Sequence, residues 1–117
     1  MAQMQKKSMT TPDETMKFDN GKMDITVVGD TSIGRMMLEP GWKWSTSVKP
    51  IAKTDSCQVS HTMYVISGKI KVKMDDGTEQ EFGPGDTGTV PPGHDAWVIG
   101  NESFVGIDFT GAKTYAK

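Results

Sequence analysis

The 117-residue sequence contains one cysteine, two histidines and only 8% aromatic residues. With the single cysteine, Cys57, the chain cannot form an internal disulfide, which excludes a fold held by such cross-links. No apolar run approaches the roughly 20 residues that a membrane-spanning helix needs. The N-terminal lysines are not followed by an apolar segment, which does not fit a secretory signal. We therefore expect a cytoplasmic protein that does not bind membranes.

A strong charge of either sign is also lacking. Thirteen basic and 15 acidic residues give a formal net charge of −2, whereas a nucleic-acid-binding domain carries a clustered excess of lysine and arginine. A chain of this length forms one domain and buries about two-thirds of the surface of its unfolded state. We therefore expect a single globular domain that does not bind nucleic acid.

Short apolar segments separated by glycine- and proline-containing turns run along most of the chain. Residues 69–74 alternate lysine with apolar residues, which is the period of a strand with one wet face and one buried face. Asp76-Gly77 follows as a turn signal, because glycine tolerates a positive φ. Strands are also expected at 22–28, 32–38, 61–66, 79–82, 87–90, 96–99 and 103–109. The pattern predicts an all-β protein without an amphipathic helix.

Two segments lack this pattern. Residues 1–21 are polar, and we interpret them as an N-terminal arm placed to pair with a neighbouring subunit, with 22–117 forming the folded domain. Such an arm would cover exposed strand edges, so we predict a homodimer. Residues 45–60 form a long polar connection interrupted by Pro50, and connections of this length in small domains tend to be functional.

Four short motifs follow one another in the second half of the chain: YVISG at 64–68, DG at 76–77, GPGD at 83–86 and PPG at 91–93. In this order they resemble the cupin superfamily. The resemblance implies a single-domain jelly-roll β-barrel, also called a double-stranded β-helix, whose mouth holds a metal ion or a small ligand. It also implies a dimer, which cupins commonly form.

The cupin pattern places three histidines and one glutamate on a single metal ion, in two motifs. The second motif reads Gly, five residues, Pro-x-Gly, two residues, His. It starts here at Gly85, and its last position holds Ala96. His94 lies two residues earlier, and an offset of two on a strand keeps a side chain on the same face. If one residue is deleted instead, Asp95 takes the position of the histidine.

The first motif reads Gly, five residues, His-x-His, three or four residues, Glu, six residues, Gly, and this chain offers two registers for it. Counting forward from Gly41 places Ser47 and Lys49 at the histidine positions. Counting back from Gly68 places His61 at the glutamate position. In the shorter spacing, this second register places the following residues at the two histidine positions: Asp55 at the first and Cys57 at the second.

The ligand set that survives from the resemblance is Cys57, His61 and His94. Nitrogen and sulfur donors suit a divalent transition metal, zinc, iron, manganese or copper, rather than calcium or magnesium. Two other interpretations stay open. In the first, the cysteine and the histidines are structural groups that are buried or hydrogen-bonded at the rim of the barrel. In the second, Cys57 forms a thiolate–imidazole pair with one histidine, which requires contact in space.

Tryptophans gather near the two motifs. Trp42 and Trp44 are two residues apart and share a face of an extended segment, while Trp97 follows the second motif. Because small-ligand sites are mostly apolar and favour barrel mouths, we expect Trp44, Tyr64 and Trp97 to line a ligand pocket. Cationic groups for a carboxylate or phosphate are available at Arg35, Lys49 and Lys53.

Two functions of different class remain. The first is a small cupin that binds a small polar metabolite, with or without a bound metal. The second is a metal-dependent enzyme of the dioxygenase, isomerase or decarboxylase type, acting on a small oxygenated substrate, with His61 or His94 as ligand or general base. The incomplete four-ligand set favours the first. The sequence contains no nucleophile elbow, phosphate-binding loop or His-Glu-x-x-His motif.

Overall fold

A computed structural model of the chain describes residues 3–110. Within this range, nine strands and two short helices follow one another. Their bounds are β1 (Glu14–Phe18), β2 (Gly21–Val28), β3 (Thr31–Leu38), α1 (Trp44–Ser47), α2 (Lys49–Ala52), β4 (His61–Ser67), β5 (Lys69–Met74), β6 (Glu79–Phe82), β7 (Thr87–Val90), β8 (His94–Ile99) and β9 (Phe104–Asp108). No helix in the described range is long and apolar enough to cross a membrane.

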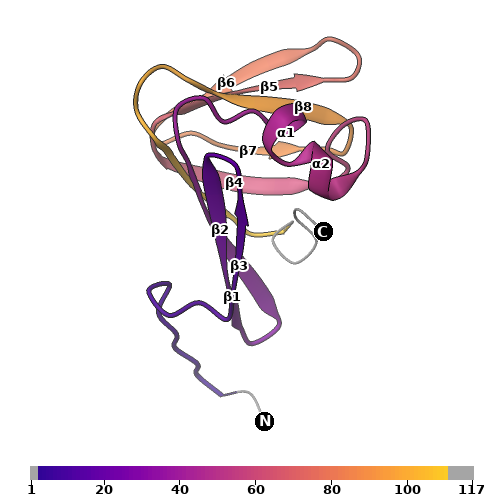
Figure 1. Ribbon diagram of the computed structural model, residues 1–117. Helices are drawn as coiled ribbons and strands as arrows, with labels where there is room; N and C mark the ends of the chain where they lie inside the picture. The colour runs from indigo at the N-terminus through magenta and orange to yellow at the C-terminus, as the bar shows by residue number, and fades with distance from the viewer. Residues whose placement is uncertain (1–2, 111–117) are drawn as a thin grey trace.

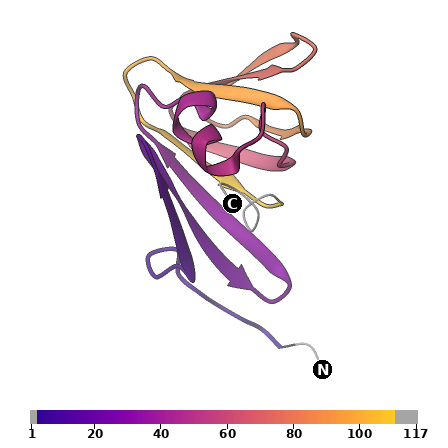
Figure 2. The ribbon, with the colours of Figure 1, turned by 45° about the vertical axis from the view of Figure 1, so that its right-hand side comes forward.

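The strands form two antiparallel sheets that lie in two layers (Figures 1 and 2). The larger sheet has the order β1-β2-β3-β9-β4-β7, and the smaller has the order β6-β5-β8. The long β2–β3 hairpin projects beyond the second layer, as Figure 2 shows. β6 and β7 are consecutive in the chain but are edge strands of different sheets, and no described ladder joins them. The fold is therefore the predicted all-β jelly roll, open along this seam rather than closed as a barrel.

Every strand predicted from the sequence is present, with ends that shift by at most two residues. Three further elements were not predicted. β1 lies within residues 1–21 and pairs with β2 of the same chain, from Glu14 opposite Ile25 to Phe18 opposite Gly21. The helix α1 begins at Trp44 and α2 follows it, so the first part of the connection at 45–60 is helical. Pro50 lies in the first turn of α2, where its missing N–H is not needed.

The segment before β1 also contacts its own chain. The backbone N–H of Val27 donates to Asp13 Oδ2 over 2.7 Å, and Arg35 Nη2 donates to the carbonyl of Met9 over 3.3 Å. These contacts hold the segment along the β2–β3 hairpin. Pairing of this arm with a neighbouring subunit stays a prediction.

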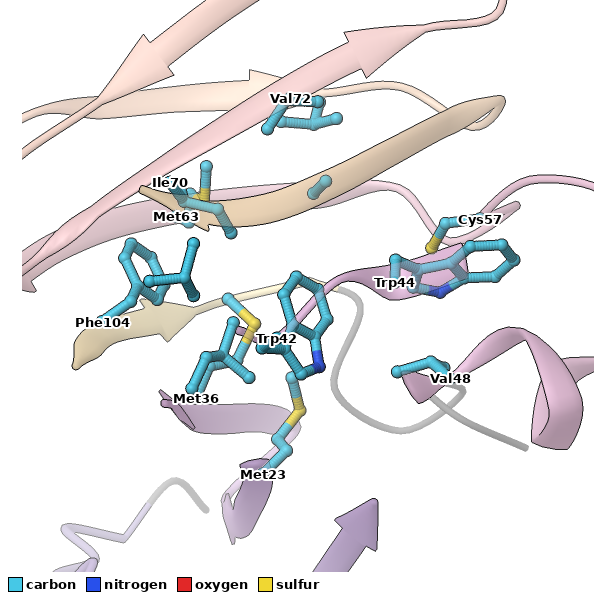
Figure 3. Close-up of a cluster of buried hydrophobic side chains, with 14 of the residues drawn as sticks. Met23, Met36, Trp42, Trp44, Val48, Cys57, Met63, Ile70, Val72 and Phe104 are labelled. Atoms are coloured by element: carbon cyan, nitrogen blue, oxygen red, sulfur yellow. The ribbon is translucent and has the colours of Figure 1, made fainter. Parts of the chain in front are cut away.

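The core lies between the two sheets and continues under α1 (Figure 3). Trp42 and Trp44 are each 2% exposed, and Met23, Leu38 and Phe104 are completely buried. Full burial of an aliphatic or aromatic side chain contributes about 1.5–3 kcal/mol each. These residues therefore fix the packing of the larger sheet against the segment that leads into α1.

The glycine of the YVISG motif marks the point where the chain leaves the larger sheet and enters the smaller one. Gly68 has a φ of 75°, and a Cβ atom at this position would lie 2.3 Å from the carbonyl oxygen of Ser103. Both the left-handed conformation and the close approach of the backbone exclude a larger residue. The backbone geometry therefore explains why the last residue of the motif is glycine.

Candidate metal centre

Three of the predicted site residues meet at one end of the jelly roll. His61 is the first residue of β4, and His94 is the first residue of β8. Cys57 lies on the segment before β4 and forms an isolated bridge to His94, in which its N–H donates to the His94 carbonyl over 2.7 Å. The ligand atoms of the three side chains all lie within 4.8 Å of one another, and all three residues are buried.

The contacts within this cluster are direct. Cys57 Sγ lies 3.9 Å from His61 Nε2. The rings of His61 and His94 meet edge to face, with centroids 5.3 Å apart and an interplanar angle of 66°. The thiolate–imidazole contact that the sequence left open is therefore present between Cys57 and His61, with His94 beside the pair.

In each histidine, the ring nitrogen that faces away from the cluster contacts a further group. His61 Nδ1 lies 2.5 Å from Oδ2 of Asp108, which is completely buried and also accepts the N–H of Thr110 at Oδ1 over 3.0 Å. His94 Nδ1 lies 2.8 Å from the carbonyl oxygen of Pro91, to which it donates. With both Nδ1 atoms engaged, the Nε2 atoms are the ones available to a bound metal.

Asp108 was not identified from the sequence. A signal for it does exist in β9, because Phe104, Gly106 and Asp108 occupy the buried positions of the strand in turn. An aspartate in phase with a buried phenylalanine must be hydrogen-bonded or paired, since an unpaired buried charge is costly. Its partner is 47 residues away in the chain, at His61.

The cluster shifts the pKa values of two of its members. Burial favours the neutral thiol of Cys57, but hydrogen bonds from His61 and His94 and the charge of His94 outweigh it and lower the thiol pKa from 9.0 to about 6. Burial also favours the neutral ring of His61, but the hydrogen bond and charge of Asp108, helped by Cys57, raise its pKa from 6.5 to about 9. At neutral pH the site thus holds a thiolate, the form of cysteine that binds metals.

A small cavity of about 30 Å³ adjoins the two histidines. It is enclosed mainly by apolar side chains from both sheets, with Trp42 and Trp44 among them. This space is somewhat more than the roughly 10–15 Å³ that a cavity needs to hold one water molecule. It therefore accepts an ion or a group of a few atoms, and not a whole metabolite.

Of the three residues predicted to line a pocket, only Trp44 lines this cavity. Residues three apart on a strand lie on opposite faces, so Tyr64 points away from the face that carries His61, and Trp97 away from that of His94. Tyr64 is 44% exposed. Trp97 instead carries Lys43 Nζ over its ring, 5.3 Å from the centroid. The three cationic residues suggested for an anion are also absent from this lining: Arg35, Lys49 and Lys53.

The register of the first motif follows from the same geometry. The count back from Gly68 is the one that delivers Cys57 and His61 to the site, while Asp55 is exposed. The forward count fails because the helices α1 and α2 take up the extra residues, and Ser47 and Lys49 fall in them.

The second motif is resolved in the same way. His94 and Ala96 both point inward, as their spacing of two requires, so the displaced histidine still reaches the site. Asp95 points the other way, and its Oδ1 accepts the N–H of Ser45 over 3.1 Å. Asp95 therefore does not take the place of the missing histidine.

The profile of one protein family, the EutQ-like cupin domain, matches residues 42–114, and this chain belongs to that family. The match covers the three residues of the cluster and also Asp108. No curated protein sequence matched the chain.

Solved structures with the same fold include an oxalate decarboxylase from Lactobacillus farciminis in complex with formate, at 19% identity and a TM-score of 0.61, with 87% of this chain and 32% of that chain covered. A protein of unknown function from Rhizobium leguminosarum is 20% identical, with a TM-score of 0.64, and the match covers 93% of this chain and 97% of that chain. The EutQ protein of Clostridium difficile is 15% identical, with a TM-score of 0.57, and the match covers 82% of this chain and 65% of that chain. The chain thus spans about a third of the decarboxylase, 32%. At these identities the likeness shows the fold alone.

Proposed function

We propose that this chain is a metal-binding small cupin, in which Cys57, His61 and His94 hold one divalent transition metal ion and leave a position for a small polar ligand. The observation that supports this most strongly is the convergence of three donor atoms within 4.8 Å in a buried cluster. A thiolate with two imidazoles suits zinc, iron(II) or copper. Manganese is expected to bind more weakly, in line with the usual order of affinities for such donors.

The donors fit such an ion in spacing, and Cys57 is already in the thiolate form that binds metals. His61, with its pKa raised to about 9, must release one ring proton when an ion binds. Two ligands on one zinc ion, with bonds of about 2.0–2.3 Å in a tetrahedral site, lie roughly 3.5 Å apart, and Cys57 Sγ and His61 Nε2 are separated by 3.9 Å. Asp108 holds His61 by its Nδ1 atom, as carboxylates do behind metal-bound histidines. When bound, the ion supplies a Lewis-acidic position beside the cavity.

Binding of a small ligand is the function that this geometry supports best. The cavity next to the histidines admits only a small group, so a ligand presents its polar end there and extends elsewhere. A metal-dependent enzyme is the second candidate. One observation favours it, because three protein ligands and an open position are the arrangement found in catalytic zinc sites.

The test is the metal content of the purified protein, before and after reconstitution with zinc, iron(II), manganese or copper. Close to one ion per chain supports the proposal, and no bound metal after reconstitution contradicts it. The two candidates are then separated with the loaded protein and small carboxylic acids as probes. Binding without carbon dioxide release or dioxygen uptake favours the binding module. Either carbon dioxide release or dioxygen uptake favours the enzyme.

We further propose that two copies associate through the outer face of the larger sheet. Tyr64 and Ile66 of β4 are 44% and 49% exposed, and Phe109, next to β9, is 46% exposed. Exposed apolar side chains gathered on one sheet commonly mark an interaction surface. A reduced thiol at the centre of the protein fits a reducing compartment such as the cytoplasm, which remains our expectation.

A further inference from the structure

A second cavity, of about 100 Å³, lies along the open seam between β6 and β7. Its walls are mainly apolar: Val72 and Met74 of β5, Phe82 of β6, Val90 of β7 and Pro91. Three polar residues complete its lining: Thr78, Gln80 and Thr89. The seam exists because the chain passes from one sheet to the other between these strands without a ladder that joins them.

This seam cavity adjoins the candidate metal centre. Val72 and Val90 line both the seam cavity and the small cavity beside the histidines. Met74 is the cross-strand partner of His94, and the Pro91 carbonyl accepts the N–H of the same ring. The two valines therefore form the wall that the small cavity shares with the seam, and a chain of a few atoms that starts at the histidines reaches the seam past these side chains.

The wall of the seam also depends on a residue without a side chain. A Cβ atom at Gly88 of β7 would lie 2.8 Å from Cε1 of Phe82. The absence of a side chain there lets the Phe82 ring extend from β6 toward β7. The phenyl ring thus supplies an apolar surface where the two layers are not joined by backbone hydrogen bonds.

We propose that the ligand of this site is a short-chain aliphatic carboxylate, with its head group at the open position of the metal and its tail in the seam. This inference rests on the proposed metal site. A carboxylate oxygen is one of the donor types that such an ion takes beside histidine and cysteine, which favours a carboxylate head. The small cavity accepts only a group of carboxylate size, and the seam offers apolar walls to an alkyl tail.

The experiment titrates acetate, propionate and butyrate into the protein loaded with cobalt(II), whose visible spectrum reports ligands at the metal. Each methylene that enters the seam is expected to raise the affinity about fourfold, so butyrate binds about 15-fold more tightly than acetate. Gln80→Trp places a large ring at the seam. It is expected to remove the gain with chain length while acetate binding and metal content stay as in the parent protein.

The matched control is Glu81→Trp, on the same strand but facing away from the seam, opposite Lys71. This variant is expected to keep the full gain with chain length. Equal affinities for acetate and butyrate in the parent protein, or an undiminished gain in Gln80→Trp, would overturn the inference. Full metal loading without any carboxylate binding would also overturn it, while the proposed metal site would stand.

A metal-free measurement separates the two proposals. Cys57 is the single cysteine of the chain, so its reaction with butyl methanethiosulfonate reports access to the cluster without any metal. Slower reaction in Gln80→Trp than in Glu81→Trp supports the seam as the route for an alkyl chain. Equal rates in the two variants overturn that route. A protein that holds no metal contradicts the proposed function, whichever result this measurement gives.

Discussion

His61 Nδ1 lies 2.5 Å from Asp108 Oδ2, and both side chains are buried. The carboxylate fixes the orientation of the ring, so that Nε2 faces Cys57 Sγ at 3.9 Å. Burial lowers the pKa of His61, but the contact with Asp108 outweighs burial and raises this pKa to about 9. The geometry of the three donors therefore depends on a fourth residue that does not itself belong to the donor cluster.

Asp108→Asn is expected to weaken metal binding about 10- to 100-fold, because the group that orients and polarises His61 is altered. The pKa of His61 in the metal-free protein should also fall from about 9 toward 6.5. A chelator competition titration measures the affinity, and the NMR signals of the ring measure the pKa. Asp55→Asn, at an exposed position, is the control. Unchanged values for both quantities in Asp108→Asn would contradict this role.

The thiol of Cys57 should titrate with a midpoint near pH 6 in the metal-free protein, where the thiolate absorbs in the ultraviolet. Its folded pKa lies below the value of 9.0 for an unperturbed thiol. The thiolate therefore stabilises the fold in full above pH 9.0, and this contribution is lost as the pH falls through about 6.

Urea unfolding of the metal-free parent and of Cys57→Ser checks this sign. The difference in unfolding free energy between them should grow in favour of the parent as the pH rises from about 6 toward 9. The ultraviolet transition should be missing in Cys57→Ser. A midpoint near 9, or a difference that shrinks over this range, would show that the cluster does not hold a thiolate.

Two glycines with positive φ should respond differently to alanine. Gly77→Ala adds a Cβ atom into open space and is expected to cost about 1 kcal/mol, the strain of the left-handed conformation alone. Gly68→Ala places its Cβ 2.3 Å from Ser103 O and should cost clearly more. Denaturant unfolding of the two variants compares them. Equal losses of stability would mean that the passage between the sheets is looser than described.

The strands were predictable because alternation along the chain is a local signal. Lys69–Met74 shows its buried face in its own sequence, and such segments need no knowledge of their partners. The helices α1 and α2 were missed because four residues each are too short to show a helical period. β1 was missed because none of its five residues is fully buried, so its sequence shows no buried face, and its partner β2 is what makes it a strand.

The candidate site was predictable only in part. Motif spacing selects Cys57 and His61, and strand parity adds His94, but their contact requires α1 and α2 to absorb the residues before Cys57. Asp108 reaches His61 because β9 lies between β3 and β4 in the sheet, an order that local patterns do not show. The positions of Tyr64 and Trp97 follow from strand parity once the two histidines are taken to point inward.

The proposed dimer is tested with Ile66→Lys, which places a charge in the exposed apolar group on β4. Light scattering of the parent at tens of micromolar should give the mass of two chains, and the variant should give the 12.8 kDa of one. Glu81→Lys, on the smaller sheet, is the control and should stay a dimer. A parent protein that is monomeric at this concentration would contradict the proposal.

Metal content of the parent and of three single variants tests the central claim most directly. His61→Ala and His94→Ala should each lose metal, because removal of one of three ligands breaks the set, while Cys57→Ser should shift the preference from soft toward harder ions. The measurement is elemental analysis after reconstitution and gel filtration. We predict close to one ion per chain in the parent and little in the two histidine variants. Equal metal content in the parent and both histidine variants, or none in the parent, would contradict the site.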